Sequence, residues 1–247
     1  NTPEVNVSTV EDPVEYRMPR VNQTQINPKV GMTFAAGLRS LLRQDPDIIM
    51  VGEIRDQETL EIAMHAAMTG HLVLSTLHTN SAAATLPRML DMGAEPFLIA
   101  STVNVIIAQR LVRKLCNECR KPYQLDEKQM ASLAKSYDTD RIFEVMKTAP
   151  ETEKIVGAAK DMQDLTFYMN GGCDQCGGEG YRGRLGIYEV LEMETNIRKL
   201  VTQAATTEEI EETARKENHM MTMVEDGFMK AIEGLTTLEE IMRATKE

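Results

Sequence analysis

Two glutamates and a histidine of this 247-residue chain each follow a short apolar or β-branched run. They are Glu11, Glu53 and His78. Such runs are typical of buried strands, and ligands of open parallel sheets bind beyond the carboxyl ends of the strands. A carboxylate placed there can orient water or a metal ion, and an imidazole among hydroxyls can bind phosphate. The three side chains together predict a site for phosphate chemistry.

Each segment also has an ordinary structural interpretation. Glu11 stands two residues before Pro13, in a sequence that also suits a polar turn. Glu53, in Gly52-Glu53, could simply close a buried strand with a charged loop. A single histidine is more often structural than functional, and His71 is a weaker second candidate near His78. Because three successive strands end in polar groups, the joint interpretation is favoured over three separate ones.

The four cysteines form two CxxC pairs, Cys116 with Cys119 and Cys173 with Cys176. Each pair is half of a tetrahedral four-cysteine zinc site. The insert between the pairs is longer than in most zinc ribbons, and redox CxxC motifs and metal-free thiols are the alternatives. Two pairs flanking one insert favour metal, and four thiolates leave no position open for water. The prediction is a structural zinc ion that pins the base of the insert 120–172.

The elements that must position these residues alternate between strand and helix in the first half of the chain. A helix capped by Thr33 carries an apolar stripe through Leu42, and a second runs from Asp56 to Gly70. Residues Pro96–Gln109 are expected to form a buried helix. The expected strands between them are Val5–Val10, Ile48–Val51 and Leu72–Ser75. This order predicts an α/β fold with a mainly parallel sheet.

The second half lacks that rhythm. Residues 120–165 are charged and weakly periodic, with one helix expected near Glu127–Lys135, and the insert's own core is expected to be small. Short helices follow from Glu194, with capping boxes predicted at Thr206/Glu209 and Thr236/Glu239. We therefore predict an α/β region over 1–115, a tetracysteine region over 116–193 and a helical region over 194–247.

Composition restricts the classes of partner. The chain has 38 acidic against 27 basic side chains, a net charge of −11, and only 4% aromatic residues. A protein that coats nucleic acid needs a basic face and stacking aromatics, so we expect no nucleic-acid partner. No run reaches the 18 or more apolar residues typical of a membrane-spanning helix.

The order of the motifs resembles one family. EDPVEY at 11–16, LLRQDPDIIMVGEIRD at 41–56 and TGHLVLSTLHTNSAA at 69–83 are similar to the Asp box, Walker B and His box of secretion ATPases of the GspE/PilB type. PRMLDMGAEPFL, QRLVRKLCNECR, the paired CxxC and YRGRLGIYEVLEM extend the resemblance over nearly the whole chain. These ATPases power type II secretion and type IV pilus assembly.

The resemblance implies a RecA-like P-loop NTPase core followed by a mainly helical, zinc-bearing region. It implies that Glu11 orients the attacking water, that Glu53 holds the Mg²⁺ shell and that His78 senses the γ-phosphate of ATP. The family's Walker A loop, GxxxxGK[ST], does not occur in this sequence. We therefore expect a C-terminal fragment that starts after the P-loop strand and helix and is inactive by itself.

The resemblance also implies the setting of the parent protein. It would be a homo-hexamer in the cytoplasm, at the inner face of the bacterial inner membrane, touching the membrane only through partners such as an inner-membrane platform protein. Retraction-type pilus ATPases lack the tetracysteine element, which favours assembly or secretion. The alternatives from other classes are a noncatalytic zinc-ribbon interaction module and a RecA-like nucleic-acid motor.

Overall fold

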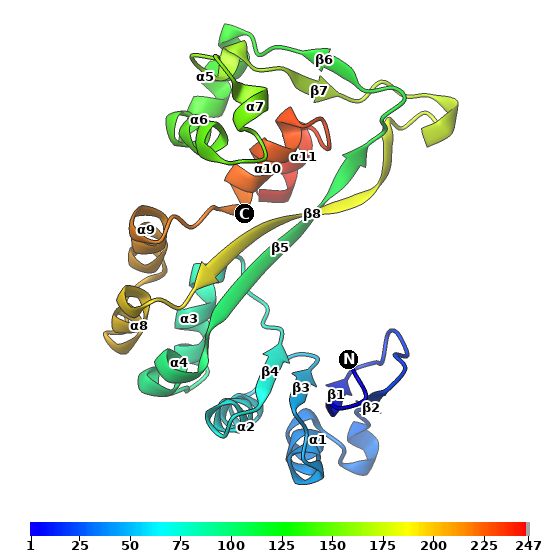
Figure 1. Cartoon of the computed structure of the whole chain (residues 1–247), viewed down its shortest axis with the longest axis vertical. Helices are drawn as coiled ribbons and strands as arrows, with labels where there is room; N and C mark the ends of the chain where they lie inside the picture. The colour runs from blue at the N-terminus through cyan, green and yellow to red at the C-terminus, as the bar shows by residue number, and fades with distance from the viewer. Residues whose placement is uncertain (246–247) are drawn as a thin grey trace. The chain divides into compact units, whose positions relative to one another are not determined.

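The computed structural model describes residues 1–245 (Figure 1). The chain divides into two compact units, each built from two segments. Unit 1 comprises Asn1–Ile106 and Leu191–Asn218, and unit 2 comprises Ile107–Val190 and the chain from His219. Two long strands, β5 (Val105–Leu115) and β8 (Tyr181–Glu192), carry the chain across the division. No helix within residues 1–245 is long and apolar enough to cross a membrane.

Unit 1 contains a four-stranded parallel sheet, which confirms the predicted α/β fold with a mainly parallel sheet. The strand order is β2-β1-β3-β4, and every neighbouring pair is parallel. The strands are β1 (Val7–Glu11), β2 (Val21–Gln25), β3 (Ile48–Val51) and β4 (Leu72–Ser75). All four carboxyl ends therefore meet at one edge of the sheet.

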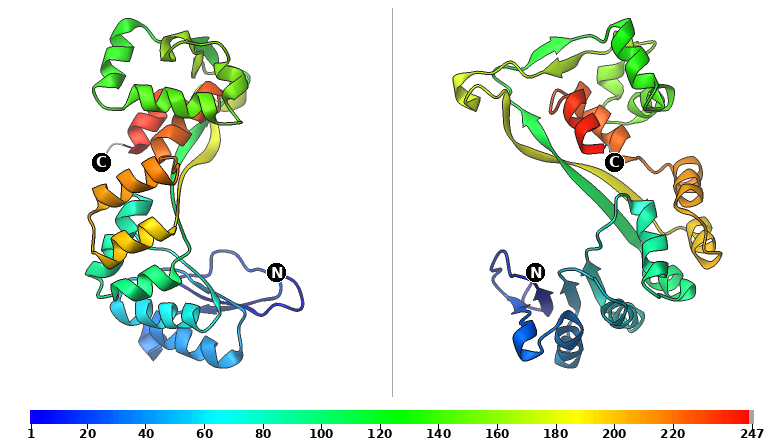
Figure 2. Two further views of the ribbon diagram at one scale, coloured as in Figure 1. Left: turned by 60° about the vertical axis from the view of Figure 1, so that its left-hand side comes forward. Right: turned by 180° about the vertical axis from the view of Figure 1, so that it is seen from behind.

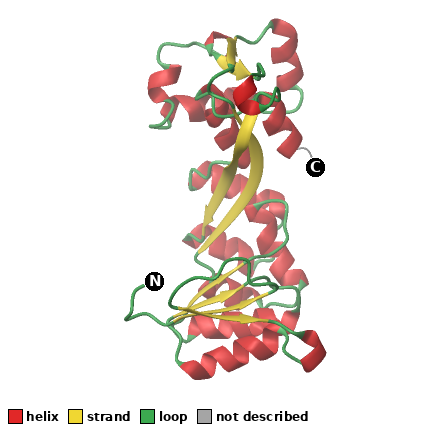
Figure 3. Cartoon of the chain, turned by 90° about the vertical axis from the view of Figure 1, so that its right-hand side faces the viewer, coloured by secondary structure: helices red, strands yellow, loops and turns green. Residues whose placement is uncertain are grey.

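Helices α1 (Phe34–Leu41) and α2 (Gln57–Met68) cover one face of this sheet (Figures 2 and 3). Val10, Ile49 and Val51 are completely buried on that face, where Val10 packs against Gly37 of α1. The side chains of Thr33 and Asp56 cap the two helices, as predicted. The opposite face carries Thr9 and Glu11 of β1 together with exposed leucines of β4. The sheet alternation thus points Glu11 away from the helices.

The remaining helices of unit 1 come from distant parts of the sequence. Helix α3 (Ala82–Asp91) packs against α9 (Thr207–Glu217), and α4 (Pro96–Thr102) packs against α2 and α8 (Thr195–Thr202). Short 3₁₀ turns occupy Pro28–Val30 and Leu42–Gln44. The guanidinium of Arg198 donates to the carbonyl of Ala100, which fastens α8 to α4.

The predicted helix over Pro96–Gln109 is wrong in its second half. Helix α4 ends at Thr102, and strand β5 begins at Val105. The run from Val103 through Ile107 is rich in β-branched residues, which lose side-chain freedom in a helix and favour a strand. Apolar content alone does not distinguish a buried helix from a buried strand. The β-branched residues indicate the strand better than the length of the apolar run does.

Unit 2 combines two two-stranded sheets with a helical core. Strands β5 and β8 pair with each other, and β6 (Lys121–Tyr123) pairs antiparallel with β7 (Phe167–Met169). The helices are α5 (Glu127–Ala134), α6 (Thr139–Thr148), α7 (Glu153–Val156), α10 (Met223–Ile232) and α11 (Leu238–Thr245), with 3₁₀ turns at Met162–Asp164 and Asp174–Cys176.

The insert between the cysteine pairs shares its core with the C-terminal helices. Phe143 and Met146 of α6 and Phe167 of β7 belong to the same buried cluster as Phe228 of α10 and Ile241 of α11. The expected helix near Glu127–Lys135 is confirmed as α5, and the sequence analysis missed α6 and α7. The insert therefore does not depend on a small core of its own.

One of the two predicted capping boxes is confirmed. Thr206 and Glu209 cap α9 reciprocally, whereas the predicted box at Thr236 is wrong by one residue. Thr237 accepts from the backbone N–H of Glu240, while the hydroxyl of Thr236 donates to the carbonyl of Arg113. This shift places Glu240 rather than Glu239 on the buried side of α11.

Candidate functional site

The carboxyl edge of the parallel sheet brings together three of the predicted site residues. Glu11 is the last residue of β1, Glu53 lies two residues beyond β3, and His78 lies three residues beyond β4. The turn after β3 is tied to both neighbours, because the N–H of Gly52 donates to the carbonyl of Val10 at 2.8 Å and the hydroxyl of Thr76 donates to the carbonyl of Gly52 at 2.7 Å. Hydrogen bonds to backbone carbonyls thus fix the turn after β3 to β1 and to the segment that follows β4.

Gly52 suits this close approach. A Cβ atom at Gly52 would lie 3.3 Å from the carbonyl oxygen of Val10 and 3.4 Å from the Cα atom of Glu11. A side chain at this position would therefore crowd the backbone of β1, and the turn or β1 would have to shift by a few tenths of an ångström. The Gly-Glu pair therefore holds two carboxylate-bearing chain segments side by side.

Glu53 is the electrostatic centre of the edge. Its Oε1 lies 2.6 Å from an Nη atom of Arg55, and its Oε2 lies 3.2 Å from Nε2 of His78. The hydrogen bond from Arg55 lowers the pKa of Glu53, burial opposes this, and His78 adds a smaller lowering. The carboxylate is therefore an anion at neutral pH, and it faces two partners that can carry positive charge. The side chain of His78 is 86% exposed and free to meet a ligand.

Polar side chains of β1 and β2 contact the carboxylate of Glu11. The residue is buried, and its Oε1 accepts from the hydroxyl of Thr9 at 2.5 Å and from the side-chain amide of Gln23 at 3.0 Å. Thr9 stands two residues earlier on the same face of β1, and Gln23 stands opposite Thr9 on β2. These two neighbours fix the direction in which the carboxylate points.

His71 does not join this edge. It precedes β4, and its Nδ1 lies 2.9 Å from the carbonyl oxygen of Ala66 and 3.1 Å from the hydroxyl of Thr69. The ring therefore satisfies the carboxyl end of α2, at the amino end of β4. His71 and His78 are separated by the length of that strand.

Sequence reasoning missed the polar partners of the glutamates. Arg55 stands two residues after Glu53, so its proximity could have been anticipated from the motif itself. Thr9 could have been found from the two-residue period of β1. Gln23 could not, because nothing in the sequence states that β2 pairs with β1 in this register.

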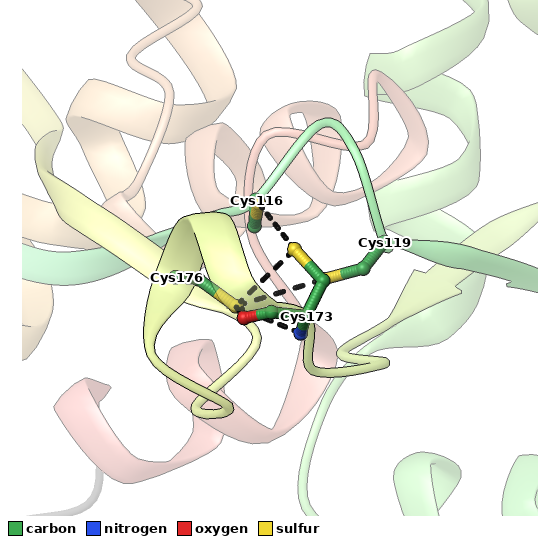
Figure 4. Close-up of side chains that lie close together, drawn as sticks. All are labelled: Cys116, Cys119, Cys173 and Cys176. Carbon is green, nitrogen blue, oxygen red and sulfur yellow. Dashed lines mark hydrogen bonds between the residues drawn. The ribbon is translucent and has the colours of Figure 1, made fainter.

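The four cysteines converge in unit 2 (Figure 4). Cys116 and Cys119 follow β5, Cys173 precedes the 3₁₀ turn Asp174–Cys176, and Cys176 is the last residue of that turn. All four Sγ atoms lie within 4.8 Å of one another, with Cys116–Cys173 and Cys119–Cys176 at 3.8 Å and Cys173–Cys176 at 3.7 Å. Tetrahedral zinc with Zn–S bonds of about 2.3 Å places its sulfurs about 3.8 Å apart. The cluster has the dimensions of a zinc site.

Backbone donors add to the fit. The N–H groups of Cys173 and Gly180 donate to Sγ of Cys176 at 3.2 and 3.1 Å. The first of these bonds is the main reason that the pKa of the Cys176 thiol is lowered to about 6, while burial raises that of Cys173 to about 11. N–H donors stabilise thiolate over thiol, and the thiolate is the metal-binding form. A Cβ at Gly171 would lie 2.0 Å from the carbonyl oxygen of Cys119, so glycine allows the two cysteine loops to meet.

Solved structures with the same fold give the class of the protein. The chain matches the pilus retraction motor PilT, crystallised with bound ADP, with a TM-score of 0.61 and 28% identity, over 98% of this chain and 53% of that one. It also matches the Legionella pneumophila ATPase DotB with a TM-score of 0.58 at 21% identity, over 96% of this chain and 50% of that one, which shows the fold alone. The α/β fold is that of these ATPases.

The sequence comparisons define the family. The family model described as "Type II/IV secretion system protein" matches residues 1–243, and the chain belongs to this family. The type IV pilus assembly ATPase PilB of Thermus thermophilus is 45% identical over 247 residues, which are all of this chain and 25% of that protein. The type II secretion system protein E of Pseudomonas aeruginosa is 46% identical over 242 residues, 98% of this chain and 43% of that protein. The chain thus spans less than half the length of these relatives.

Proposed function

We propose that this chain is part of an ATPase that drives type IV pilus assembly or type II protein secretion. The observation that carries the proposal is the position of Glu11, Glu53 and His78 at the carboxyl edge of a parallel sheet, where His78 contacts Glu53. Phosphoryl transfer needs positioning and electrostatic stabilisation rather than a covalent nucleophile, and these residue types suffice for both. The names of the relatives favour this function over the zinc-ribbon module and the nucleic-acid motor.

Each of the three residues has a distinct role in the proposal. Glu11 orients the attacking water and accepts its hydrogen bond, because its buried carboxylate is held in one direction. His78 contacts the γ-phosphate of ATP through its exposed ring. His71 is left out of the proposed site, because its ring is engaged with the end of α2.

Glu53 is the residue that would hold the Mg²⁺ shell. A carboxylate with a lowered pKa is ionised at neutral pH and suits a hard cation, and Mg²⁺ in nucleotide sites uses one or two carboxylates with water. The ion would supply charge neutralisation for the phosphates.

The 247 residues lack the phosphate cradle. The GxxxxGK[ST] sequence supplies backbone N–H groups and a lysine that bind the phosphates of ATP in P-loop enzymes, and it does not occur in this chain. The proposed activity therefore belongs to a longer gene product that contains a Walker A loop. The chain alone is proposed to be inactive.

The tetracysteine cluster is proposed to bind one zinc ion with a structural role. The sulfur separations and the N–H donors to Cys176 support zinc, and four thiolates leave no open coordination position. We retain the functional division into an ATPase core over 1–115, a zinc-binding region over 116–193 and a helical region over 194–247. The gene product is proposed to act as a cytoplasmic homo-hexamer on an inner-membrane platform protein, with no nucleic-acid partner.

The test is Glu11→Gln in the gene product that includes the Walker A loop. Removing one well-placed electrostatic group typically lowers the rate about 10²–10³-fold, and we expect this loss in kcat while nucleotide still binds. Glu15→Gln is the matched control, because Glu15 is an exposed carboxylate four residues further along the same segment. Near-wild-type turnover of the Glu11 variant, with loss in the Glu15 variant, would transfer the role to Glu15.

A further inference from the structure

The side-chain amide of Gln23 makes three hydrogen bonds around Glu11. Its Nε2 donates to Oε1 of Glu11 at 3.0 Å and to the carbonyl oxygen of Tyr16 at 2.9 Å, and its Oε1 accepts from the N–H of Met18 at 2.8 Å. Both donor hydrogens and the acceptor of the amide are used. Gln23 is half-buried on β2, directly opposite Thr9 of β1.

These bonds determine which oxygen of Glu11 is available. Thr9 and Gln23 both donate to Oε1, and within residues 1–245 no protein group donates to Oε2. The terminal torsion of a glutamate side chain is broad, so one hydrogen bond alone would leave the carboxylate free to turn. Two donors that converge on Oε1 from neighbouring strands therefore hold the carboxylate in one orientation and leave Oε2 as its available oxygen.

The same amide holds the loop that follows Glu11. Residues 12–20 connect β1 to β2, and Tyr16 in this loop is 82% exposed. The loop's backbone meets Gln23 at two points, Tyr16 and Met18, while Gln25 makes one longer contact, accepting from the N–H of Val14 at 3.4 Å. One side chain therefore couples the position of the loop to the orientation of the carboxylate.

We propose that Gln23 is the positioning residue for Glu11, fixing the free carboxylate oxygen and coupling it to the 12–20 loop. This rests on the proposed catalytic role of Glu11. Gln23 does not touch the reacting atoms; it acts through the direction of the carboxylate. Its loss is expected to lower kcat and leave nucleotide affinity unchanged, because the amide contacts only Glu11 and the loop.

The first measurement uses the 247-residue chain. Gln23→Met keeps the length of the side chain and removes all three hydrogen bonds. Hydrogen exchange at the Met18 amide is expected to accelerate, while exchange at Gly52, whose N–H bonds to Val10, stays as in the wild type. Unchanged exchange at Met18 would overturn the proposed hold on the loop.

The second measurement uses the gene product with the Walker A loop. Gln23→Met is expected to lower kcat about 10-fold to 100-fold, the effect of losing a hydrogen bond to a charged group, with KM for ATP within about 2-fold. Gln25→Met is the control, since Gln25 pairs with Glu11 through the strand backbone while its side chain accepts from the loop at Val14, and its kcat should be unchanged. Gln23→Glu should recover activity as the pH falls, because the protonated acid can again donate to Oε1 of Glu11.

The outcomes separate this inference from the function it rests on. Full kcat in Gln23→Met, together with an inactive Glu11→Gln variant, would overturn the role of Gln23 and leave that of Glu11 intact. Full activity of Glu11→Gln would overturn both. Equal losses in Gln23→Met and Gln25→Met would attribute the effect to the loop rather than to the carboxylate, and would also refute the proposal.

Discussion

Replacing the buried carboxylate of Glu240 is expected to destabilise unit 2. Glu240 lies on α11 and accepts four hydrogen bonds from two arginines: the N–H and an Nη of Arg113 at 2.9 and 2.7 Å, and Nε and an Nη of Arg243 at 3.0 and 2.7 Å. The guanidinium of Arg113 also lies 4.1 Å from the ring centroid of Tyr181 on β8. One carboxylate thus joins α11 to β5, beside the first cysteine pair.

The magnitude follows from the pKa. Burial by itself raises the pKa of Glu240, but the bonds from Arg243 and Arg113 outweigh it and lower the pKa from the ordinary 4.5 to about 2. A pKa that is lower by about 2.5 in the folded state than in the unfolded state corresponds to about 3.4 kcal/mol of unfolding free energy at neutral pH. The side chains of Arg113 and Arg243 are 48% and 60% exposed, so water screens part of this. We expect Glu240→Gln to cost about 2–3 kcal/mol.

The sign of the pH dependence gives a second check. The pKa is lower in the folded state, so the contribution is complete well above pH 4.5 and is lost as the pH falls toward 2. The difference in unfolding free energy between the wild type and Glu240→Gln should therefore shrink by about 1 kcal/mol as the pH falls from 7 to 4. Glu239→Gln is the matched control, because Glu239 is the exposed neighbour on the same helix.

Urea denaturation followed at NMR signals of unit 2 measures these differences. The amide of Leu115, which donates to the carbonyl of Leu235 at 2.9 Å, reports the junction of β5 with the C-terminal helices. A Glu240→Gln variant as stable as Glu239→Gln at pH 7 would refute the reasoning. A gap that stays constant from pH 7 to pH 4 would show that ionisation of Glu240 is not its source.

Three further results are expected. The 247-residue chain should release no phosphate from ATP above background, and robust turnover that Glu11→Gln abolishes would contradict the need for a Walker A loop. Protein purified without chelator should contain one zinc per chain by elemental analysis, and chelation or Cys173→Ser should lower the thermal midpoint of unit 2; a zinc content near zero would exclude the site. In the gene product with a Walker A loop, Glu53→Gln should raise the Mg²⁺ concentration needed for half-maximal turnover, and an unchanged Mg²⁺ dependence would remove Glu53 from the metal shell.

The elements that carry the motifs could be predicted because their signals are local. The apolar runs of β3 and β4 and the caps of α1 and α2 lie where the sequence indicates. Their alternation is sufficient for a parallel sheet, and a parallel sheet by itself gathers the ends of its strands at one edge. The meeting of Glu53 with His78, 25 residues apart, follows from that rule without knowledge of any distance.

Features that depend on pairing could not be predicted in this way. The first residues of β5 lie in the run predicted as a helix, because a short apolar run suits either element and the pairing of β5 with β8 is not visible in the sequence. From the sequence alone, Glu240 is expected to be a surface residue of an acidic helix. Its partner Arg113 is 127 positions away in the sequence and lies beside it only in the folded chain. The length of the cysteine insert likewise does not indicate that α6 packs on α10, in a core shared with α11.

Reactive residues can therefore be recognised in the sequence, whereas the residues that orient them become recognisable only in the folded chain. A catalytic or metal-binding type is recognised by its chemistry at the end of a strand, and the topology then determines its location. An orienting residue such as Gln23 has no distinctive chemistry, because a glutamine amide serves equally well on any surface. What makes it specific is the register Thr9↔Gln23, which places its donor beside Glu11. A shift of one residue would turn Gln23 to the helix-covered face and leave Glu11 with Thr9 alone. The precision of the proposed site therefore resides in strand pairing, which is the property that a motif does not encode.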